Sequence, residues 1–319
     1  MQDQYRREIN YLRISLTDRC NLRCIYCMPA EGVEKQHHRD ILSLEEIAEI
    51  AEAAVELGIN NIRLPGGEPL TRLGVTWLIK RLSALPGVRE IGMTTNGILL
   101  PKMAQELKDA GLTRVNISLD TLDTARYRQI TRCGTLADVL AGIEAAERVG
   151  LTPIKLNAVL IGGFNDCEIP AMVELTREKP IEMRFIELMP IGDTDIFGPE
   201  AYIPVDTVLE RAPELQPLPD GAPGAVAKLF ALPGAKGRVG LISPISHSFC
   251  SSCNRIRLTA DGFLKPCLHS SREIPLRGLH GDELRRTFAY AIGQKPEEHN
   301  VLSRTERSDA ARNMHEIGG

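Results

Sequence analysis

Short apolar segments alternate with longer amphipathic segments along the first two thirds of the chain. Six short segments, each bounded by turn residues, predict strands: Tyr11–Leu16, Asn61–Leu64, Glu90–Thr94, Arg114–Leu119, Ile154–Leu160 and Glu182–Glu187. Helical periodicity between them predicts helices, including Lys102–Ala110, Leu136–Val149, Ile169–Glu178 and one that starts at the capping box Ser43-x2-Glu46. Six strand–helix units in series predict parallel strands joined by right-handed crossovers.

Two α/β architectures fit this order of elements, an open doubly wound sheet and a barrel-like sheet. Six units are too few for a complete eight-stranded barrel. The candidate binding residues described below follow the carboxyl ends of the strands, which is where ligands bind in parallel sheets. Both architectures place ligands there, and we choose a partial barrel because the family resemblance described below implies a partial (βα)6 barrel of the TIM type.

The pattern changes near residue 190, after which Pro, Gly and Asp are frequent. Further strands are predicted at Val226–Phe230 and Arg238–Ile242, a hairpin at Arg255–Leu258 and Phe263–Lys265, and a helix at Gly281–Ile292. We expect two parts, a barrel over residues 1–190 and a C-terminal extension over residues 191–319.

Composition narrows the class of protein. The chain has 319 residues, of which 43% are hydrophobic and 25% charged, as is usual for a globular protein rather than a disordered one. A net charge of −4 argues against a general nucleic-acid binder, and no apolar run is long enough for a membrane span. Because Met1 to Glu8 are polar and charged, we expect no secretory signal and a cytoplasmic location.

Six of the eight cysteines fall into two groups of three. The first trio has the spacing Cys20-x3-Cys24-x2-Cys27, and the second is Cys250-x2-Cys253-x13-Cys267. Without a secretory signal these cysteines indicate metal binding rather than disulfides. Three thiolates leave one position of a four-ligand site open for an exogenous ligand. His247 and His269 lie close to the second trio in sequence, so a structural zinc site stays open as an alternative there.

Basic residues recur on the predicted strands. Arg13, Arg63 and Lys155 lie on the first, second and fifth strands, while Arg255 and Arg257 form an i, i+2 pair beside the second trio. An i, i+2 pair on a strand faces one side of the sheet, and two guanidinium groups there suit a phosphate-rich ligand. The alternative is a solvated, salt-bridged strand face.

The first trio after the first strand, Gly66-Gly67-Glu68-Pro69 after the second, and the six-unit body together resemble the radical S-adenosylmethionine enzymes. The resemblance implies a [4Fe–4S] cluster on the first trio, whose open iron binds S-adenosylmethionine. Further motifs are similar to those of the members that act on GTP in molybdenum cofactor biosynthesis. These are Leu12–Cys20, Arg63 ahead of the glycines, Arg184–Met189, the second trio with its two arginines, and the C-terminal Gly318-Gly319.

This resemblance implies a role for each matching residue. It implies S-adenosylmethionine contacts from Tyr26, Gly67, Ser118 and Met189, and GTP contacts from Arg13, Arg63, Thr94, Lys155, Arg255, Ile256 and Arg257. It implies a second [4Fe–4S] cluster on Cys250, Cys253 and Cys267, and a catalytic tail formed by Gly318 and Gly319.

The implied activity is a lyase reaction that closes GTP into a 3′,8-cyclic nucleotide. The implied partners are an external low-potential electron donor and a downstream cyclic pyranopterin monophosphate synthase, with no nucleic acid and no membrane, for a monomer or homodimer. Pro65 departs from the pattern, since the family usually has threonine there.

Two alternative functions stay open at this point. A peptide-modifying radical enzyme also carries auxiliary clusters, although it has no reason to gather arginines for phosphate. A zinc-ribbon scaffold explains the second trio alone. Cys133 and Cys167 match no motif and receive no role.

Overall fold

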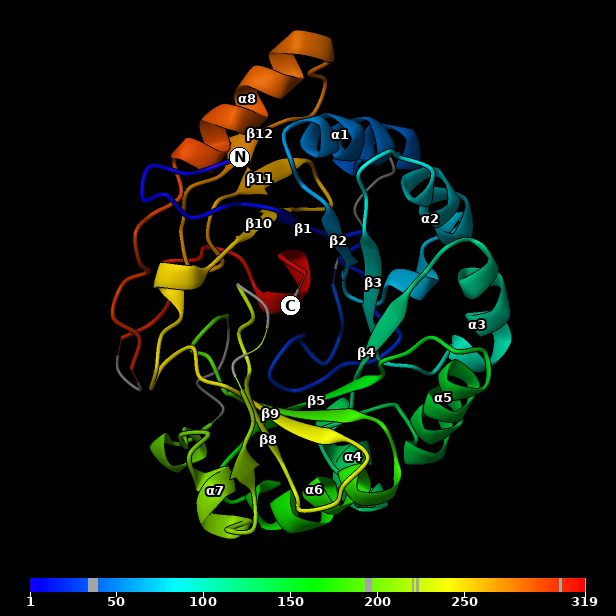
Figure 1. Cartoon of the computed structure of the whole chain (residues 1–319), viewed down its shortest axis with the longest axis vertical. Coiled ribbons are helices and arrows are strands. Elements are labelled where there is room, and N and C mark those ends of the chain that lie inside the picture. Colours follow the sequence, from blue (N-terminus) through cyan, green and yellow to red (C-terminus); the bar gives the residue numbers. More distant parts are fainter. Residues whose placement is uncertain (34–39, 193–196, 220, 222–223, 304–305, 319) are drawn as a thin grey trace.

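The computed structural model describes residues 1–33, 40–192, 197–219, 221, 224–303 and 306–318 (Figure 1). Six strands follow one another in the order β1 (Tyr11–Ile14), β2 (Asn61–Leu64), β3 (Glu90–Thr95), β4 (Arg114–Ser118), β5 (Lys155–Leu160) and β6 (Glu182–Glu187). Each pairs in parallel with the next. The six predicted strands and their parallel arrangement are therefore confirmed, with ends that shift by one or two residues.

The helices of this part lie on the outer side of the curved sheet (Figure 1). They are α1 (Leu44–Glu56), α2 (Val75–Ser83), α3 (Leu100–Asp109), α4 (Thr124–Thr131), α5 (Leu136–Arg148) and α6 (Ile169–Glu178). The predicted capping box is present at α1, where the Ser43 side chain accepts from Glu46 N and the Glu46 carboxylate accepts from Ser43 N. A cap of this kind stabilises a helix by about 1 kcal/mol.

The C-terminal part continues the same sheet on both sides. It contains α7 (Thr207–Arg211), β7 (Gln216–Pro217), β8 (Lys228–Ala231), β9 (Arg238–Ile242), β10 (Arg255–Leu258), β11 (Phe263–Lys265), β12 (Ile274–Pro275) and α8 (Gly281–Gly293). Strand β9 pairs in parallel with β6, and β10 pairs in parallel with β1. Over the described residues the strands form one twelve-stranded sheet in the order β12-β11-β10-β1-β2-β3-β4-β5-β6-β9-β8-β7. The predicted boundary near residue 190 stays a prediction.

Alternation along β1 explains how this sheet holds both a core and a site. Leu12 and Ile14 are fully buried in the main hydrophobic core, whereas Tyr11 and Arg13 face the inside of the curved sheet. A strand of a closed, packed barrel carries apolar residues on both faces. Here the inner face is polar, which leaves the interior available for a ligand. In the part of the chain that the structure describes, no helix is both long and apolar enough to cross a membrane.

Candidate active site

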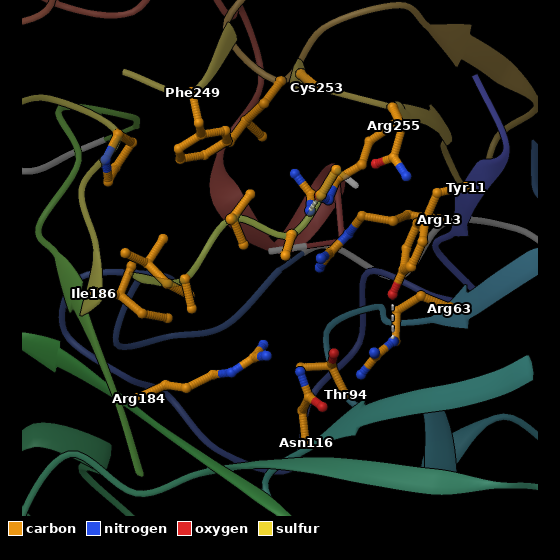
Figure 2. Close-up of a pocket in the computed structure, with 18 of the residues that line it drawn as sticks. Tyr11, Arg13, Arg63, Thr94, Asn116, Arg184, Ile186, Phe249, Cys253 and Arg255 are labelled. Atoms are coloured by element: carbon orange, nitrogen blue, oxygen red, sulfur yellow. Dashed lines mark hydrogen bonds between the residues drawn. The ribbon is translucent and has the colours of Figure 1, made fainter. Parts of the chain in front are cut away.

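Inward-facing residues of the parallel strands surround one cavity of about 530 Å³ (Figure 2). Residues separated by more than 200 positions meet there because β10 lies beside β1. Ten of the residues predicted to bind a cluster, S-adenosylmethionine or GTP line it: Arg13, Arg63, Thr94, Lys155, Met189, Cys250, Cys253, Arg255, Arg257 and Cys267. The structure therefore gathers most of the predicted GTP set and the whole second trio in one place.

The cavity wall is strongly basic. Among the described residues that line it, nine are Arg or Lys and two are Glu, so positive charge dominates this part of the wall. Burial would raise the pKa of Glu182, but Arg184, Lys155 and Arg238 outweigh it and lower that pKa to about 2. Burial and the Arg184 charge lower the pKa of Lys155 to about 8, although Glu182 opposes them. An interior with this charge balance suits a polyanionic ligand such as a nucleoside triphosphate.

Arg13 and Arg257 hold the C-terminal tail inside the cavity. The two residues are register neighbours on β1 and β10, and each donates from a guanidinium nitrogen to the Gly318 carbonyl oxygen at 2.9 Å. Burial and the adjacent Arg257 lower the pKa of Arg13 well below its usual value. The tail thus reaches the cavity residues at Gly318, while Gly319 lies outside the described residues.

The channel around Gly318 admits only glycine. Its φ of 66° lies in the left-handed region, and a Cβ there would come 2.7 Å from Pro65 Cγ and 3.3 Å from Ser15 Cβ. Pro65, the residue that departs from the family pattern, therefore forms part of the channel wall.

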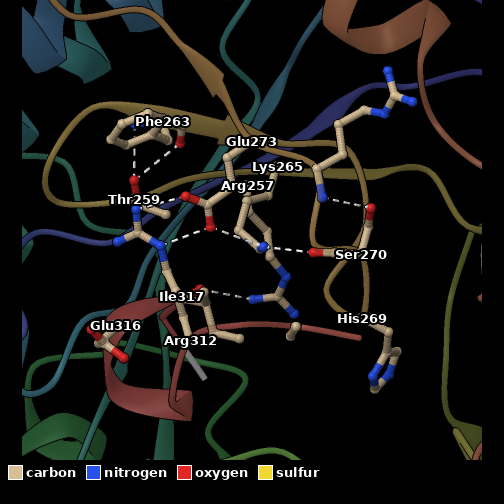
Figure 3. A network of polar contacts seen from close by, with 12 residues as sticks. Arg257, Thr259, Phe263, Lys265, His269, Ser270, Glu273, Arg312, Glu316 and Ile317 are labelled. Carbon is tan, nitrogen blue, oxygen red and sulfur yellow. Dashed lines mark hydrogen bonds and ion pairs between the residues drawn. The ribbon is translucent and has the colours of Figure 1, made fainter. Parts of the chain in front are cut away.

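The segment that precedes Gly318 is anchored at two points, of which Figure 3 shows the first, where Arg312 meets Glu273. Arg312, which precedes the last turn of the chain, forms ion pairs with Asp261 at 2.8 Å and with Glu273 at 2.7 Å. The His315 ring nitrogen Nδ1 lies 2.8 Å from the carbonyl oxygen of Cys27. The tail consequently contacts the loop of the first trio as well as the cavity that contains the second.

The loop of the first trio, between β1 and α1, packs tightly against the glycines that follow β2. Gly67 N donates to Thr17 O at 2.6 Å, and Glu68 N donates to Arg19 O at 2.7 Å. A Cβ on Gly67 would lie only 2.3 Å from Arg19 O. The close approach of two backbones explains why this position requires glycine.

A second contact holds the other side of this loop. One Arg132 guanidinium nitrogen donates to Arg23 O at 3.0 Å and to Met28 O at 2.9 Å, on either side of Cys24 and Cys27. Arg132 has a φ of 62°, which a non-glycine residue adopts only when its surroundings impose it. The sequence analysis gave Arg132 no role, since no local pattern predicts this contact.

The chemistry of the first trio fits a cluster better than a single ion. Burial raises the pKa of Cys20 to about 11, that of Cys27 to about 12, and that of Cys24 well above its usual value. Such thiols need a bound metal to be thiolates at neutral pH. Among the described residues, no three His, Cys, Asp or Glu side chains are placed to hold one metal ion. A [4Fe–4S] cluster makes no such demand, because each of its cysteines ligates a different iron.

The second trio lies in a more polar environment. Burial opposes ionisation of Cys250 and Cys253, yet contacts with His299 lower the pKa of Cys250, and Lys295 and Arg255 lower that of Cys253. Of the two candidate zinc ligands, His247 pairs with Asp206 at 3.0 Å and His269 contacts Ser308 at 3.1 Å. His299, which the sequence analysis missed, interacts with Cys250. The backbone of His269 hydrogen-bonds to Cys267, whose pKa is nevertheless raised, chiefly by burial.

The remaining predicted residues lie outside the cavity wall. Tyr26 donates to the Asp120 carboxylate at 2.7 Å, which also accepts from Val159 N at 2.8 Å. Gly67 follows β2 and Ser118 ends β4, with β3 between these two strands, and the Ile256 side chain is buried in the core. On the cavity wall, Asn157 Oδ1 is buried and no described residue hydrogen-bonds to it, as expected for an acceptor that serves a ligand.

Three further polar residues of the cavity received no role from the sequence, although Arg184 stands in one of the motifs. Tyr11, Arg114 and Arg184 all face inward from β1, β4 and β6. Their signal was present, because each stands two residues from another inward-facing polar residue on the same strand. The sequence analysis also missed that Glu68 links the end of β2 to the end of β3. Its carboxylate is fully buried and accepts from Thr95 Oγ1 and from Asn96 N.

Comparison with known proteins identifies the class. Residues 14–176 match the model of the radical SAM superfamily, and residues 181–301 match the model Molybdenum Cofactor Synthesis C. The chain belongs to the radical SAM superfamily. Solved structures show the same fold at low sequence identity. SuiB of Streptococcus suis bound to S-adenosylmethionine has a TM-score of 0.59 and 14% identity, over 87% of this chain and 63% of that chain. Native anSMEcpe with bound AdoMet has a TM-score of 0.55 and 13% identity, over 92% and 82%.

Curated relatives narrow the family within this superfamily. A GTP 3′,8-cyclase of Alkaliphilus oremlandii is 51% identical over 322 residues, with all of both chains covered. A GTP 3′,8-cyclase of Moorella thermoacetica is 52% identical over 327 residues, again with all of both chains covered. The chain is therefore a member of the GTP 3′,8-cyclase family. Its cofactors are S-adenosylmethionine and [4Fe–4S] clusters, with the second cluster in the C-terminal part.

Proposed function

We propose that this chain converts GTP into (8S)-3′,8-cyclo-7,8-dihydroguanosine 5′-triphosphate, the first step of molybdenum cofactor biosynthesis. The observation that carries the proposal is the basic cavity, which joins nine Arg or Lys residues to the second cysteine trio in a volume that accommodates a nucleotide. The names of relatives about 50% identical over their full length support it.

In this proposal the six cysteines hold two clusters, with Cys20, Cys24 and Cys27 on one and Cys250, Cys253 and Cys267 on the other. When bound, the first cluster supplies the electron that cleaves S-adenosylmethionine into methionine and a 5′-deoxyadenosyl radical. The S-adenosylmethionine contacts are Tyr26, Gly67, Ser118 and Met189. The GTP contacts are Arg13, Arg63, Thr94, Lys155, Arg255, Ile256 and Arg257.

The residues of the chain orient the substrate and exclude water. Arginine forks fix phosphate oxygens in a defined direction, which places the ribose and guanine for bond formation between C3′ and C8. The Asp120 carboxylate holds the Tyr26 phenol, and Glu68 holds the loop after β3. The tail, with Ile317 buried and Gly318 held by two arginines, restricts access of water to a reactive radical. We assign Gly318 to the active site on this ground, and Gly319, which lies outside the described residues, on the family resemblance alone.

Other parts of the proposal concern partners. The reaction needs an external low-potential electron donor, and its product is the substrate of a cyclic pyranopterin monophosphate synthase. We expect a cytoplasmic monomer or homodimer that binds neither nucleic acid nor membrane.

The test is anaerobic incubation of the reconstituted protein with a low-potential reductant, S-adenosylmethionine and GTP. We expect 5′-deoxyadenosine and a cyclised nucleotide, neither of which the Cys24→Ser protein should form. If deoxyadenosine forms equally well without GTP but increases with a peptide, the GTP assignment is wrong and a peptide-modifying function replaces it. If the purified protein contains about one zinc and no iron, the scaffold alternative is correct.

A further inference from the structure

Tyr11, the first residue of β1, occupies the centre of the basic wall (Figure 2). Its register neighbours are Asn61 on β2 and Arg255 on β10. Figure 2 shows its phenol pointing into the cavity toward Arg63, beside Arg13. None of the motifs that carry the cluster, S-adenosylmethionine or GTP assignments uses this residue.

The phenol oxygen of Tyr11 orients Arg63. Arg63 Nε donates to that oxygen at 3.1 Å, and a terminal nitrogen of the same guanidinium makes a longer contact with Met93 O at 3.4 Å. The guanidinium lies so close to Gly92 that a Cβ there would come 2.9 Å from its central carbon. Arg63 is 2% exposed, so the hydrogen bond to Tyr11 and the packing of its guanidinium against Gly92 fix the direction in which the guanidinium points.

The ring of Tyr11 supports a second arginine. The guanidinium carbon of Arg255 lies 5.7 Å from the centre of the Tyr11 ring and 5.8 Å from the centre of the Phe249 ring. Its NH2 group also donates to Gly224 O at 2.8 Å. A cation can be held over two aromatic faces in this way, and none of the described residues forms an ion pair with Arg255 that would cancel its charge.

We propose that Tyr11 is a positioning residue for the phosphates of the substrate, whose phenol oxygen orients Arg63 and whose ring supports Arg255. The inference rests on the proposed function, in which a nucleoside triphosphate occupies this cavity. A carboxylate in the same place would hold the arginines more strongly, but it would compete with phosphate for them permanently. A phenol oxygen is a weaker acceptor, so phosphate oxygens can replace it as the hydrogen-bond partner of the arginines.

The charges around Tyr11 give this arrangement a pH signature. Burial would raise the pKa of the phenol, but nearby guanidinium groups outweigh it and lower that pKa to about 7. The positive groups that face Tyr11 come from β1, β2, β4, β6 and β10 and are Arg13, Arg63, Arg114, Arg184, Arg255 and Arg257. The one acid among the described groups there is Glu90 on β3, which is paired with Arg114. Phosphates in the cavity counter these same positive charges and so favour the protonated phenol. Binding of GTP should therefore take up a proton near pH 7, and affinity should fall as pH rises above it.

Two variants separate the two roles. Tyr11→Phe removes only the phenol oxygen, and we expect KM for GTP to rise about tenfold with kcat changed less than twofold. Tyr11→Leu also removes the ring, which should raise KM about fivefold more. Tyr290→Leu on α8, a tyrosine exposed on the outside of the fold, is the matched control and should leave both parameters unchanged. Iron content and thermal unfolding of each iron-loaded protein verify that folding is intact.

A mutant cycle tests whether Tyr11 acts through the two arginines. The Tyr11→Phe effect on KM should disappear in an Arg63→Ala background, and the additional effect of Tyr11→Leu should disappear in an Arg255→Ala background. Effects that simply add in both backgrounds would overturn the proposal. So would a kcat loss in Tyr11→Phe that equals or exceeds the KM change.

The pH profile supplies a readout that does not depend on the variants folding equally well. Between pH 6.5 and 8.5, GTP affinity of the wild-type holoenzyme should fall relative to that of Tyr11→Phe, and the titration of the γ-phosphate is common to both. Calorimetry in buffers of different ionisation enthalpy should show more proton uptake at pH 7.5 for the wild-type protein than for Tyr11→Phe, because Lys155, whose pKa is about 8, is present in both. Parallel profiles, or equal proton uptake in the two proteins, would contradict the proposal. A wild-type holoenzyme that binds no GTP at all would instead refute the proposed function.

Discussion

Replacement of Gly67 by alanine tests how the loop of the first trio is held. The added Cβ would lie 2.3 Å from Arg19 O and 2.6 Å from Asp18 O, and both neighbours are backbone atoms that cannot rotate away. Relief of that overlap requires the two segments to separate by roughly 1 Å, because non-bonded carbon and oxygen atoms need more than 3 Å.

The magnitude follows from the hydrogen bonds that bridge the two segments. A separation of that size breaks the bonds from Gly67 N at 2.6 Å and Glu68 N at 2.7 Å. Each bond contributes about 1 kcal/mol net, and a buried group left without a partner costs about 1–3 kcal/mol. We therefore expect the free energy of unfolding to fall by about 2–5 kcal/mol, and the affinity for S-adenosylmethionine to fall with it.

The assay is anaerobic thermal unfolding of the iron-loaded protein, together with equilibrium binding of S-adenosylmethionine. The expected drop in Tm is about 5–10 °C. Gly293→Ala at the end of α8 is the matched control, because no atom lies within 4 Å of the added Cβ and its stability should stay equal or rise slightly. If the two variants unfold within 2 °C of each other, the backbone contact does not hold the loop and the reasoning is refuted.

Three further predictions concern the tail and the clusters. Arg312→Ala should expose the tail to proteolysis and lower activity about tenfold at unchanged iron content, because it removes the ion pairs that anchor the tail. The control is Arg285→Ala, which removes the exposed ion pair between Arg285 on α8 and Glu56 and should change neither proteolysis nor activity. Arg132→Ala should speed the loss of iron from the first cluster to a chelator, since it removes two contacts that hold the loop; equal rates in variant and wild type would contradict this role. Cys24→Ser and Cys253→Ser should each lower iron from about eight to about four per chain, and a loss of all iron in either would show that the two sites are not independent.

Local patterns were sufficient to predict most of the barrel. The strands carry an apolar face that repeats every second residue, and Ser43 with Glu46 marks the start of α1 without reference to the rest of the chain. Helix α2 was missed because Gly74 caps it without a side chain, and α4 because its eight residues give too short an apolar stripe. Strands β7 and β12 have two residues each, too few for any periodicity.

The candidate site divides in the same way. The cysteine spacing, the glycines after β2 and the double glycine at the end are local motifs, so the sequence identified them directly. Tyr11, Asp120 and Arg132 act through partners more than 35 residues away, and no neighbouring residue in the sequence indicates those partners. The sequence analysis also assigned Arg13 and Arg257 to phosphate alone, whereas the structure shows that both also hold the tail carbonyl.

The sequence by itself determined the elements, the two three-cysteine motifs and the excess of basic residues on alternate strand positions, because these depend on spacing along the chain. The tertiary structure decided that β10 lies beside β1, which brings Arg257 next to Arg13 and the second trio into the barrel. It also decided that Tyr11 lies among arginines from several strands and that Gly318 fits a channel walled by Pro65. These contacts depend on strand order and register, which arise from packing of the whole core and leave no signal at the residues themselves.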